Sequence, residues 1–155
     1  MAELAGRLEN VSKRFTQRLQ ASFHQAGLDY RDHVIEIEWL SKSRFASLMR
    51  QATVYLDTIG FSGFNTAMQA IEAGLPVVTR EGRFLRGRLA SGILRRIGMT
   101  ETIAESVNEY VDLAGMLAQD WDLRLALGGR LEGPTSHVRC DLAPIRTFES
   151  FIRAC

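Results

Sequence analysis

The hydrophobic positions near the start of the chain recur at intervals of three and four residues. This spacing is typical of an amphipathic helix, whose apolar side chains share one face. It predicts a helix over residues 3–26, which Gly27 ends. The apolar positions of this helix are Leu4, Leu8, Val11, Phe15, Leu19 and Phe23.

Four short runs of apolar, β-branched or aromatic residues predict strands. They lie at 34–39, 54–56, 75–79 and 102–104. Segments with helical periodicity separate them and follow them. We expect helices after Ser41 or Ser43, at 65–73, at 84–97, after the capping box 106–109, at 121–131 and at 148–152. Gly74 and Gly98 are placed to end two of these helices.

Apolar strands that alternate with helices predict an α/β fold with a Rossmann-like parallel sheet and helices on both faces. A doubly wound domain normally begins with a strand, whereas this chain opens with a helix of about 24 residues. We therefore expect a fold that lacks its first strand. The segment 133–155 is expected to form a C-terminal loop and helix, and residues 1–155 to form one domain.

Composition narrows the class of protein. The hydrophobic content of 46% and the charged content of 24% are typical of a globular protein. The net charge of +1 does not indicate a nucleic-acid or membrane partner, and no apolar run is long enough to span a bilayer. Cys140 and Cys155 form neither a metal-binding spacing nor a disulfide framework, which favours a cytoplasmic location. The three histidines, at 24, 33 and 137, also lack metal-ligand spacing, so no metal site is predicted.

The segment 57–69 carries the candidate chemistry. Gly60 and Gly63 allow a tight loop after a strand, and Asn65 and Thr66 then open a helix. Free N–H groups at that helix start favour a diphosphate, and Gln69, one turn later, could bond a sugar hydroxyl. In the simpler interpretation, Asn65 is an N-cap and Gln69 is a solvated helix residue. The glycine spacing matches neither a Walker loop nor a dinucleotide fingerprint.

The residues LDT at 56–58, NT at 65–66 and EAGLPVVT at 72–79, followed by LRGRLASGIL at 85–94, resemble a known family. They are similar to the C-terminal lobe of GT-B glycosyltransferases, in the SPINDLY-type O-linked N-acetylglucosamine transferase family. That family includes related bacterial N-glucosyltransferases. The resemblance covers residues 34–120 and implies that the chain binds a UDP-sugar donor, with no other cofactor, and acts on a protein acceptor at Ser/Thr or Asn.

The resemblance also implies roles for particular positions. Gly63 and Thr66 match the family's loop, whereas Phe64 stands where the family has His. Asn65 and Gln69 replace a Thr and an Asp of the family pattern. Arg88 matches an arginine of that pattern.

Upstream, Lys42 stands where the family has a Lys near the uridine, and Phe45 where it has a His against the base. The family's diphosphate-contacting Gln and Lys precede the segment with which this chain begins, and its proposed base belongs to the other lobe. No catalytic residue is therefore assigned, and we expect the chain to be inactive without an N-terminal lobe or TPR region.

An arginine cluster offers an alternative function. The simpler interpretation of the clustered arginines is that they form a solvated helix face. In the alternative, the chain is a non-catalytic GT-B-like module that binds protein partners through an arginine-rich helix at 83–96. A third interpretation, a sugar-nucleotide epimerase, would need carboxylates in the cleft, for which Glu72 and Glu81 are the nearby choices. The cluster comprises Arg80, Arg83, Arg86, Arg88, Arg95 and Arg96.

Overall fold

The computed structural model describes residues 2–131 and 141–154, the side chains of residues 2–11 excepted. The loop predicted at 133–136 and His137 lie outside this part of the chain. The chain divides into two compact units, Met1–Leu40 and Ser41–Cys155. Within the described residues, no helix is both long and apolar enough to cross a membrane.

The first unit consists of helix α1 (Ala2–Gln25) and the short helix α2 (Tyr30–His33). The predicted N-terminal helix and its glycine stop are confirmed, since Gly27 has a φ of 73° and follows the last turn. The ring of Phe23 lies edge-on to Tyr30 and stacks on His33, so α2 folds back against the end of α1.

The strand predicted at 34–39 is wrong, because these residues take no regular secondary structure. A strand is stabilised by a neighbouring strand and by burial of one face. No described strand pairs with this segment, and Ile35 and Trp39 are exposed. The segment is instead held locally: the Glu36 carboxylate accepts hydrogen bonds from Tyr30 (2.6 Å) and Thr16 (2.9 Å).

The second unit contains a parallel sheet whose three described strands lie in the order β1-β2-β3. They are β1 (Tyr55–Leu56), β2 (Val77–Arg80) and β3 (Ile103–Ala104). Tyr55 is in register with Val77, and Thr79 with Ile103. The predicted α/β class with a parallel sheet is therefore confirmed.

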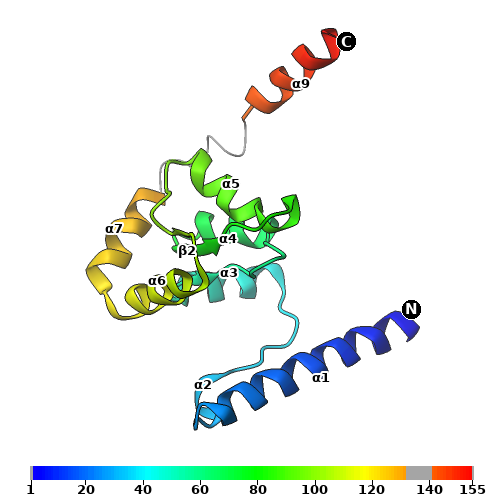
Figure 1. Cartoon of the computed structure of the whole chain (residues 1–155), viewed down its shortest axis with the longest axis vertical. Helices are drawn as coiled ribbons and strands as arrows, with labels where there is room; N and C mark the ends of the chain where they lie inside the picture. The colour runs from blue at the N-terminus through cyan, green and yellow to red at the C-terminus, as the bar shows by residue number, and fades with distance from the viewer. Residues whose placement is uncertain (1, 132–140, 155) are drawn as a thin grey trace. The chain divides into compact units, whose positions relative to one another are not determined.

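Helices surround this sheet in the alternation that the sequence predicted (Figure 1). Along the chain, helix α4 connects β1 to β2, α5 connects β2 to β3, and α6 follows β3. The most deeply buried side chains come from these elements and include Ile71, Val78, Leu94 and Leu117. The helices of this unit are α3 (Lys42–Gln51), α4 (Asn65–Glu72), α5 (Leu89–Arg96), α6 (Val107–Gln119), α7 (Trp121–Leu131) and α9 (Ala143–Arg153).

Local sequence signals explain several helix ends. Ser41 caps α3 through the N–H of Arg44, and Ser106 caps α6 through the N–H of Glu109. Gly74 ends α4 with a φ of 72°, a conformation that side-chain-bearing residues rarely adopt.

The helix predicted at 84–97 begins only at Leu89, after a single 3₁₀ turn, η1 (Leu85–Gly87). The backbones of Gly82 and Gly87 explain the late start. The N–H of Gly82 donates to the carbonyl of Gly87 at 2.8 Å, and this bond closes a compact turn that a continuous helix could not make. Arg83 and Arg86 therefore lie in a turn, and the arginine-rich helix at 83–96 is corrected to a turn followed by α5.

Candidate functional site

Two loops leave the carboxyl edge of the sheet. Residues 57–64 follow β1 and lead into α4, and residues 81–88 follow β2 and lead into α5. Because the strands are parallel, both loops emerge at the same edge, where open α/β sheets bind ligands. A backbone hydrogen bond from Ser62 N–H to the Arg86 carbonyl (2.6 Å) joins the two loops.

Asp57 organises this edge from inside the protein. Its carboxylate is 1% exposed and accepts three hydrogen bonds. One oxygen accepts from the hydroxyls of Ser62 and Thr79, both at 2.7 Å, and the other accepts from the N–H of Gly63 at 2.8 Å. A buried carboxylate is tolerated only with such partners. Asp57 therefore fixes the loop that precedes α4 against the end of β2.

Ser62 extends this network to the next helix. Its Oγ accepts a hydrogen bond from the N–H of Ala90 at 2.8 Å, in the first turn of α5. A helix start leaves such N–H groups unsatisfied, and a serine hydroxyl is a preferred partner for them. Here the hydroxyl comes from 28 residues upstream, so the starts of α4 and α5 are held in a fixed relation.

Tyr110 on α6 contacts the backbone of Asp57 at the same edge of the sheet. Its hydroxyl donates to the backbone carbonyl of Asp57 at 2.9 Å. Burial raises the pKa of Tyr110, and the neighbouring Asp57 and Tyr55 raise it further. The tyrosine therefore remains a neutral hydrogen-bond donor at physiological pH.

Gly63 is required by close packing. A Cβ at this position would overlap the hydroxyl of Thr66 and would lie 2.7 Å from the hydroxyl of Tyr55. These two hydroxyls are hydrogen-bonded to each other at 2.8 Å. Because each hydroxyl carries one hydrogen and the pair uses only one of them, one O–H of this pair can still donate to another group.

Helix α4 begins without a side-chain cap. Its N-cap is Phe64, which makes no side-chain hydrogen bond to the helix, so the alternative interpretation of Asn65 as N-cap is wrong. Asn65 is the first helical residue, and it is exposed, as is Gln69 one turn later. Free N–H groups and the helix dipole make this start attractive to an anion.

Lys42 and Phe45 lie in the first turn of α3. Lys42 is exposed, whereas Phe45 is half-buried and packs against the hydrophobic core. The last residues of α3 line one cavity together with Ala73 and Gly74, which follow α4, and Pro76 at the amino edge of the sheet. The first turns of both helices therefore lie away from that cavity, toward the carboxyl edge.

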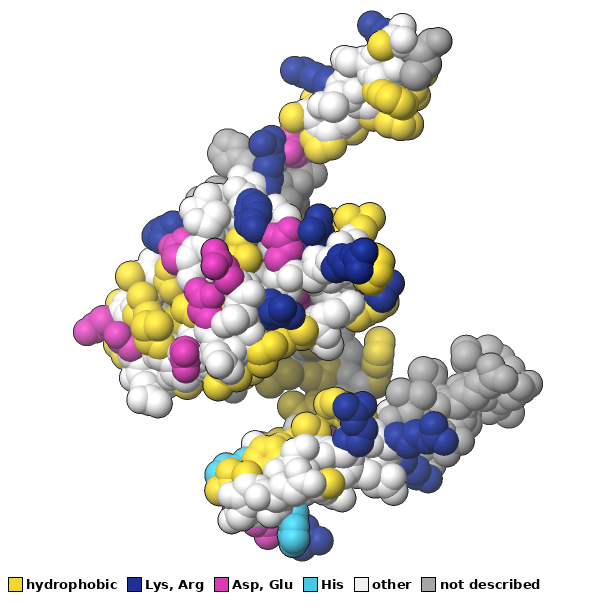
Figure 2. Space-filling view, in the orientation of Figure 1, with side chains coloured by type: hydrophobic (Ala, Val, Ile, Leu, Met, Phe, Trp, Pro, Cys, Tyr) yellow, Lys and Arg dark blue, Asp and Glu magenta, His cyan; other side chains and the backbone are white. Residues whose placement is uncertain are grey.

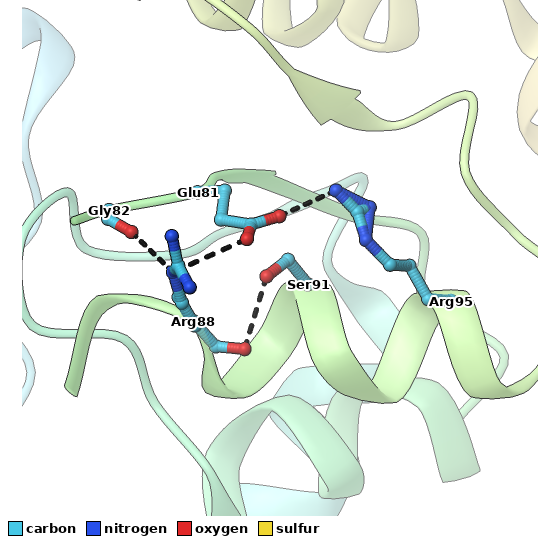
Figure 3. Close-up of polar contacts among 5 residues, drawn as sticks. All are labelled: Glu81, Gly82, Arg88, Ser91 and Arg95. Carbon is cyan, nitrogen blue, oxygen red and sulfur yellow. Dashed lines mark hydrogen bonds and ion pairs between the residues drawn. The ribbon is translucent and has the colours of Figure 1, made fainter. Parts of the chain in front are cut away.

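Arg88 joins this edge through the segment that follows β2. Its Nε donates to the carbonyl of Gly82 at 2.7 Å and lies 3.3 Å from the Glu81 carboxylate (Figure 3). Arg95, in the last turn of α5, contacts the other oxygen of the Glu81 carboxylate at 2.5 Å. Glu81 is thus paired with two arginines, and the guanidinium of Arg88 is held while half of its side chain stays exposed.

The predicted site residues fall into three groups, and Lys42 and Phe45 in the first turn of α3 are the first of them. Gly63, Phe64, Asn65, Thr66 and Gln69 surround the start of α4, and Arg88 immediately precedes α5.

The sequence placed Asp57 directly after a predicted strand but did not reveal its hydrogen-bond network. The available signal was an acidic residue directly after a buried strand, since a carboxylate there must find donors. The residues that were missed are Tyr55, Thr79 and Tyr110.

The Rossmann-like parallel sheet with its surrounding helices is the fold of the C-terminal half of GT-B glycosyltransferases. The model of glycosyl transferase family 41 matches residues 13–139, and the chain belongs to this family. A solved O-GlcNAc transferase of Thermobaculum terrenum, a lysine-to-methionine mutant, superposes with a TM-score of 0.72 and 27% identity over 81% of this chain and 24% of that chain.

Curated relatives with similar sequences are consistent with membership of this family. A probable UDP-N-acetylglucosamine–peptide N-acetylglucosaminyltransferase SPINDLY of Oryza sativa subsp. japonica is 34% identical over 80 residues, which cover 49% of this chain and 9% of the relative. A UDP-N-acetylglucosamine–peptide N-acetylglucosaminyltransferase of Caenorhabditis elegans is 37% identical over 71 residues, 46% of this chain and 6% of the relative. The matched region thus spans less than a tenth of either relative.

Proposed function

We propose that this chain supplies the UDP-sugar-binding portion of a protein glycosyltransferase that modifies Ser/Thr or Asn side chains. The start of α4 carries this proposal: it lies at the carboxyl edge of the sheet without a side-chain cap. In the proposal the diphosphate lies against the first N–H groups of α4, a position that the dipole of the helix favours.

The surrounding side chains have distinct roles in this proposal. Gln69 and the free O–H of the Tyr55–Thr66 pair contact sugar or phosphate oxygens. Arg88 offers a guanidinium to the diphosphate, because guanidinium groups bind phosphate oxygens through paired N–H donors. Lys42 and Phe45 contact the uridine, and the partly exposed ring of Phe45 stacks on the base.

We further propose that transfer needs protein beyond residues 1–155, which form part of one lobe with 133–155 as its C-terminal loop and helix. Glycosyl transfer requires the acceptor to be held against the donor, and in GT-B enzymes the acceptor lies across a cleft between two lobes. In this proposal an N-terminal lobe or a TPR region supplies the other side of the cleft. A cytoplasmic location is part of the same proposal, and the lack of a disulfide spacing favours it.

An NMR titration of the isotope-labelled chain with UDP tests donor binding. We expect amide shifts at Gly63, Asn65, Thr66 and Gln69. In the variant Arg88→Ala the affinity should fall several-fold, whereas Arg95→Ala, which removes the other partner of Glu81, should leave it unchanged. No shift of these amides at millimolar UDP would overturn the proposal, and equal losses in the two variants would remove Arg88 from the site.

The alternative, a non-catalytic interaction module, retains support from Phe64, which stands where the family has a histidine. In that case UDP would cause no shift at the start of α4, while a protein ligand would still bind at the 81–88 segment. The same titration therefore separates the two functions.

A further inference from the structure

The segment 83–86 presents a basic and aromatic surface beside the candidate donor site. The hydrogen bonds from Gly82 to Gly87 and from Gly87 to Phe84, both 2.8 Å, close its backbone into a compact turn. The side chains between these glycines point outward: Phe84 is 57% exposed and Leu85 is 78% exposed. Basic and hydrophobic side chains lie next to one another on this part of the surface (Figure 2).

The guanidinium groups of two arginines lie close to the ring of Phe84. The Arg86 guanidinium lies 4.7 Å from the centre of the Phe84 ring, and that of Arg83 lies 5.7 Å from it. Such contacts orient the arginines without neutralising them. The two charges are thus displayed on one ring and are separated by no more than roughly 10 Å, a bound set by the two cation–π distances.

These two arginines differ from the three arginines of the cluster that have carboxylate partners. Within the described part of the chain, Arg88 and Arg95 pair with Glu81, and Arg96 pairs with Asp141. Arg83 and Arg86 have no carboxylate partner among the described residues. Their N–H donors are therefore available to carboxylates from another molecule, which arginine binds in a bidentate manner.

The surface is held in place and has apolar neighbours. The Ser62 N–H to Arg86 carbonyl bond ties it to the loop before α4. Phe64, itself 54% exposed, lines an apolar hollow together with Leu85 and Leu89, and residues of α9 line the rest of it. A ligand that contacts the arginine pair therefore has an apolar surface within reach.

We propose that the turn 83–86 binds an extended acidic segment of the acceptor polypeptide, with two carboxylates on Arg83 and Arg86 and an apolar side chain against Leu85 and Phe64. In an extended chain, residues two or three apart are separated by about 7–10 Å, which lies within the upper bound on the separation of the two guanidinium groups. This inference rests on the proposed transferase function, because it names the acceptor class that this edge of the sheet selects.

Fluorescence polarisation with a labelled peptide of about ten residues tests the inference. The probe contains Ser and Asn, one Phe, and two Asp residues placed two apart, and a control peptide has Lys in place of both Asp. We expect binding of the acidic peptide only. Affinity should fall at least tenfold in the double variant R83E/R86E and several-fold in Phe84→Ala, and it should weaken with added salt. Arg50→Glu, at the amino edge of the sheet, should bind normally.

The outcomes separate this inference from the donor proposal. Unchanged peptide affinity in R83E/R86E, or equal binding of the basic control peptide, overturns the acidic-segment inference. If UDP still shifts the amides of α4 in R83E/R86E, the proposed donor site is retained, regardless of the peptide affinity that this variant shows. Tighter binding of a ten-nucleotide single strand than of the acidic peptide, lost in the same double variant, overturns the inference in favour of a nucleic-acid surface.

Discussion

The buried carboxylate of Asp57 accepts a hydrogen bond of 2.7 Å from the hydroxyl of Thr79, which lies 22 residues further along the chain. The contact joins the carboxyl ends of two parallel strands at the point where both candidate loops begin. The same carboxylate holds Ser62 and Gly63, so one side chain positions the starts of two helices.

Replacing Asp57 by alanine should strongly destabilise the second unit. The change leaves the donors of Ser62, Thr79 and Gly63 buried without an acceptor, and we expect a loss of about 3 kcal/mol in the free energy of unfolding. Asp57→Asn, which keeps one carbonyl oxygen, should lose less. Urea unfolding followed by circular dichroism measures both.

The matched control is Asp112→Ala on the exposed face of α6, which should change the stability by no more than about 0.5 kcal/mol. Similar losses for Asp57→Ala and Asp112→Ala would contradict the role given to the buried carboxylate.

Substituting Gly63 by alanine should disturb the loop through a direct overlap. The new Cβ would meet the Thr66 hydroxyl and the Tyr55 hydroxyl, and overpacking of this kind costs about 1–3 kcal/mol. Thr66→Ala removes the nearer atom, so the double variant should be destabilised by less than the sum of the single changes. A thermal or urea double-mutant cycle tests this coupling, and strict additivity would show that the two residues do not meet.

Two adjacent glycines of α7 should respond in opposite directions. Gly129→Ala has no heavy atom within 4 Å of the new Cβ and should stabilise the helix by about 0.5–1 kcal/mol. Gly128→Ala places its Cβ 2.9 Å from the backbone oxygen of Gly74, which ends α4, and should be destabilising. Melting temperatures of the two variants decide the matter, and an increase for both would show that α7 does not approach Gly74 this closely.

Tyr110 should ionise above the ordinary tyrosine pKa of about 10. Burial and the Asp57 charge raise its pKa in the folded state, so its contribution to stability is present below pH 10 and is lost as the pH rises through the folded value. An absorbance titration near 295 nm should contain a late component that Tyr110→Phe removes. Tyr30 also has a raised pKa, chiefly from its hydrogen bond to Glu36, so Tyr30→Phe is the control that removes a different late component. A titration curve that Tyr110→Phe does not alter would contradict the buried hydrogen bond.

Local signals in the sequence were reliable where neighbouring residues decide the structure. Ser41 and Ser106 mark helix starts through bonds to N–H groups three residues away, and Gly27, Gly74 and Gly98 mark helix ends through their positive φ. The alternation of apolar strands and helices was sufficient for the parallel sheet, because its periodicity reflects burial that any such sheet requires.

The sequence by itself determined the α/β class, the helix boundaries set by caps, and the resemblance that the family match then established. Tertiary structure decided what depended on distant partners. It left residues 34–39 without a strand to pair with, it packed Gly82 against Gly87 and so delayed α5, and it brought Ser62 to the N–H of Ala90. These outcomes depend on contacts between residues far apart in the chain, and hydrophobic periodicity carries no information about which distant donor a buried acceptor such as Asp57 will meet.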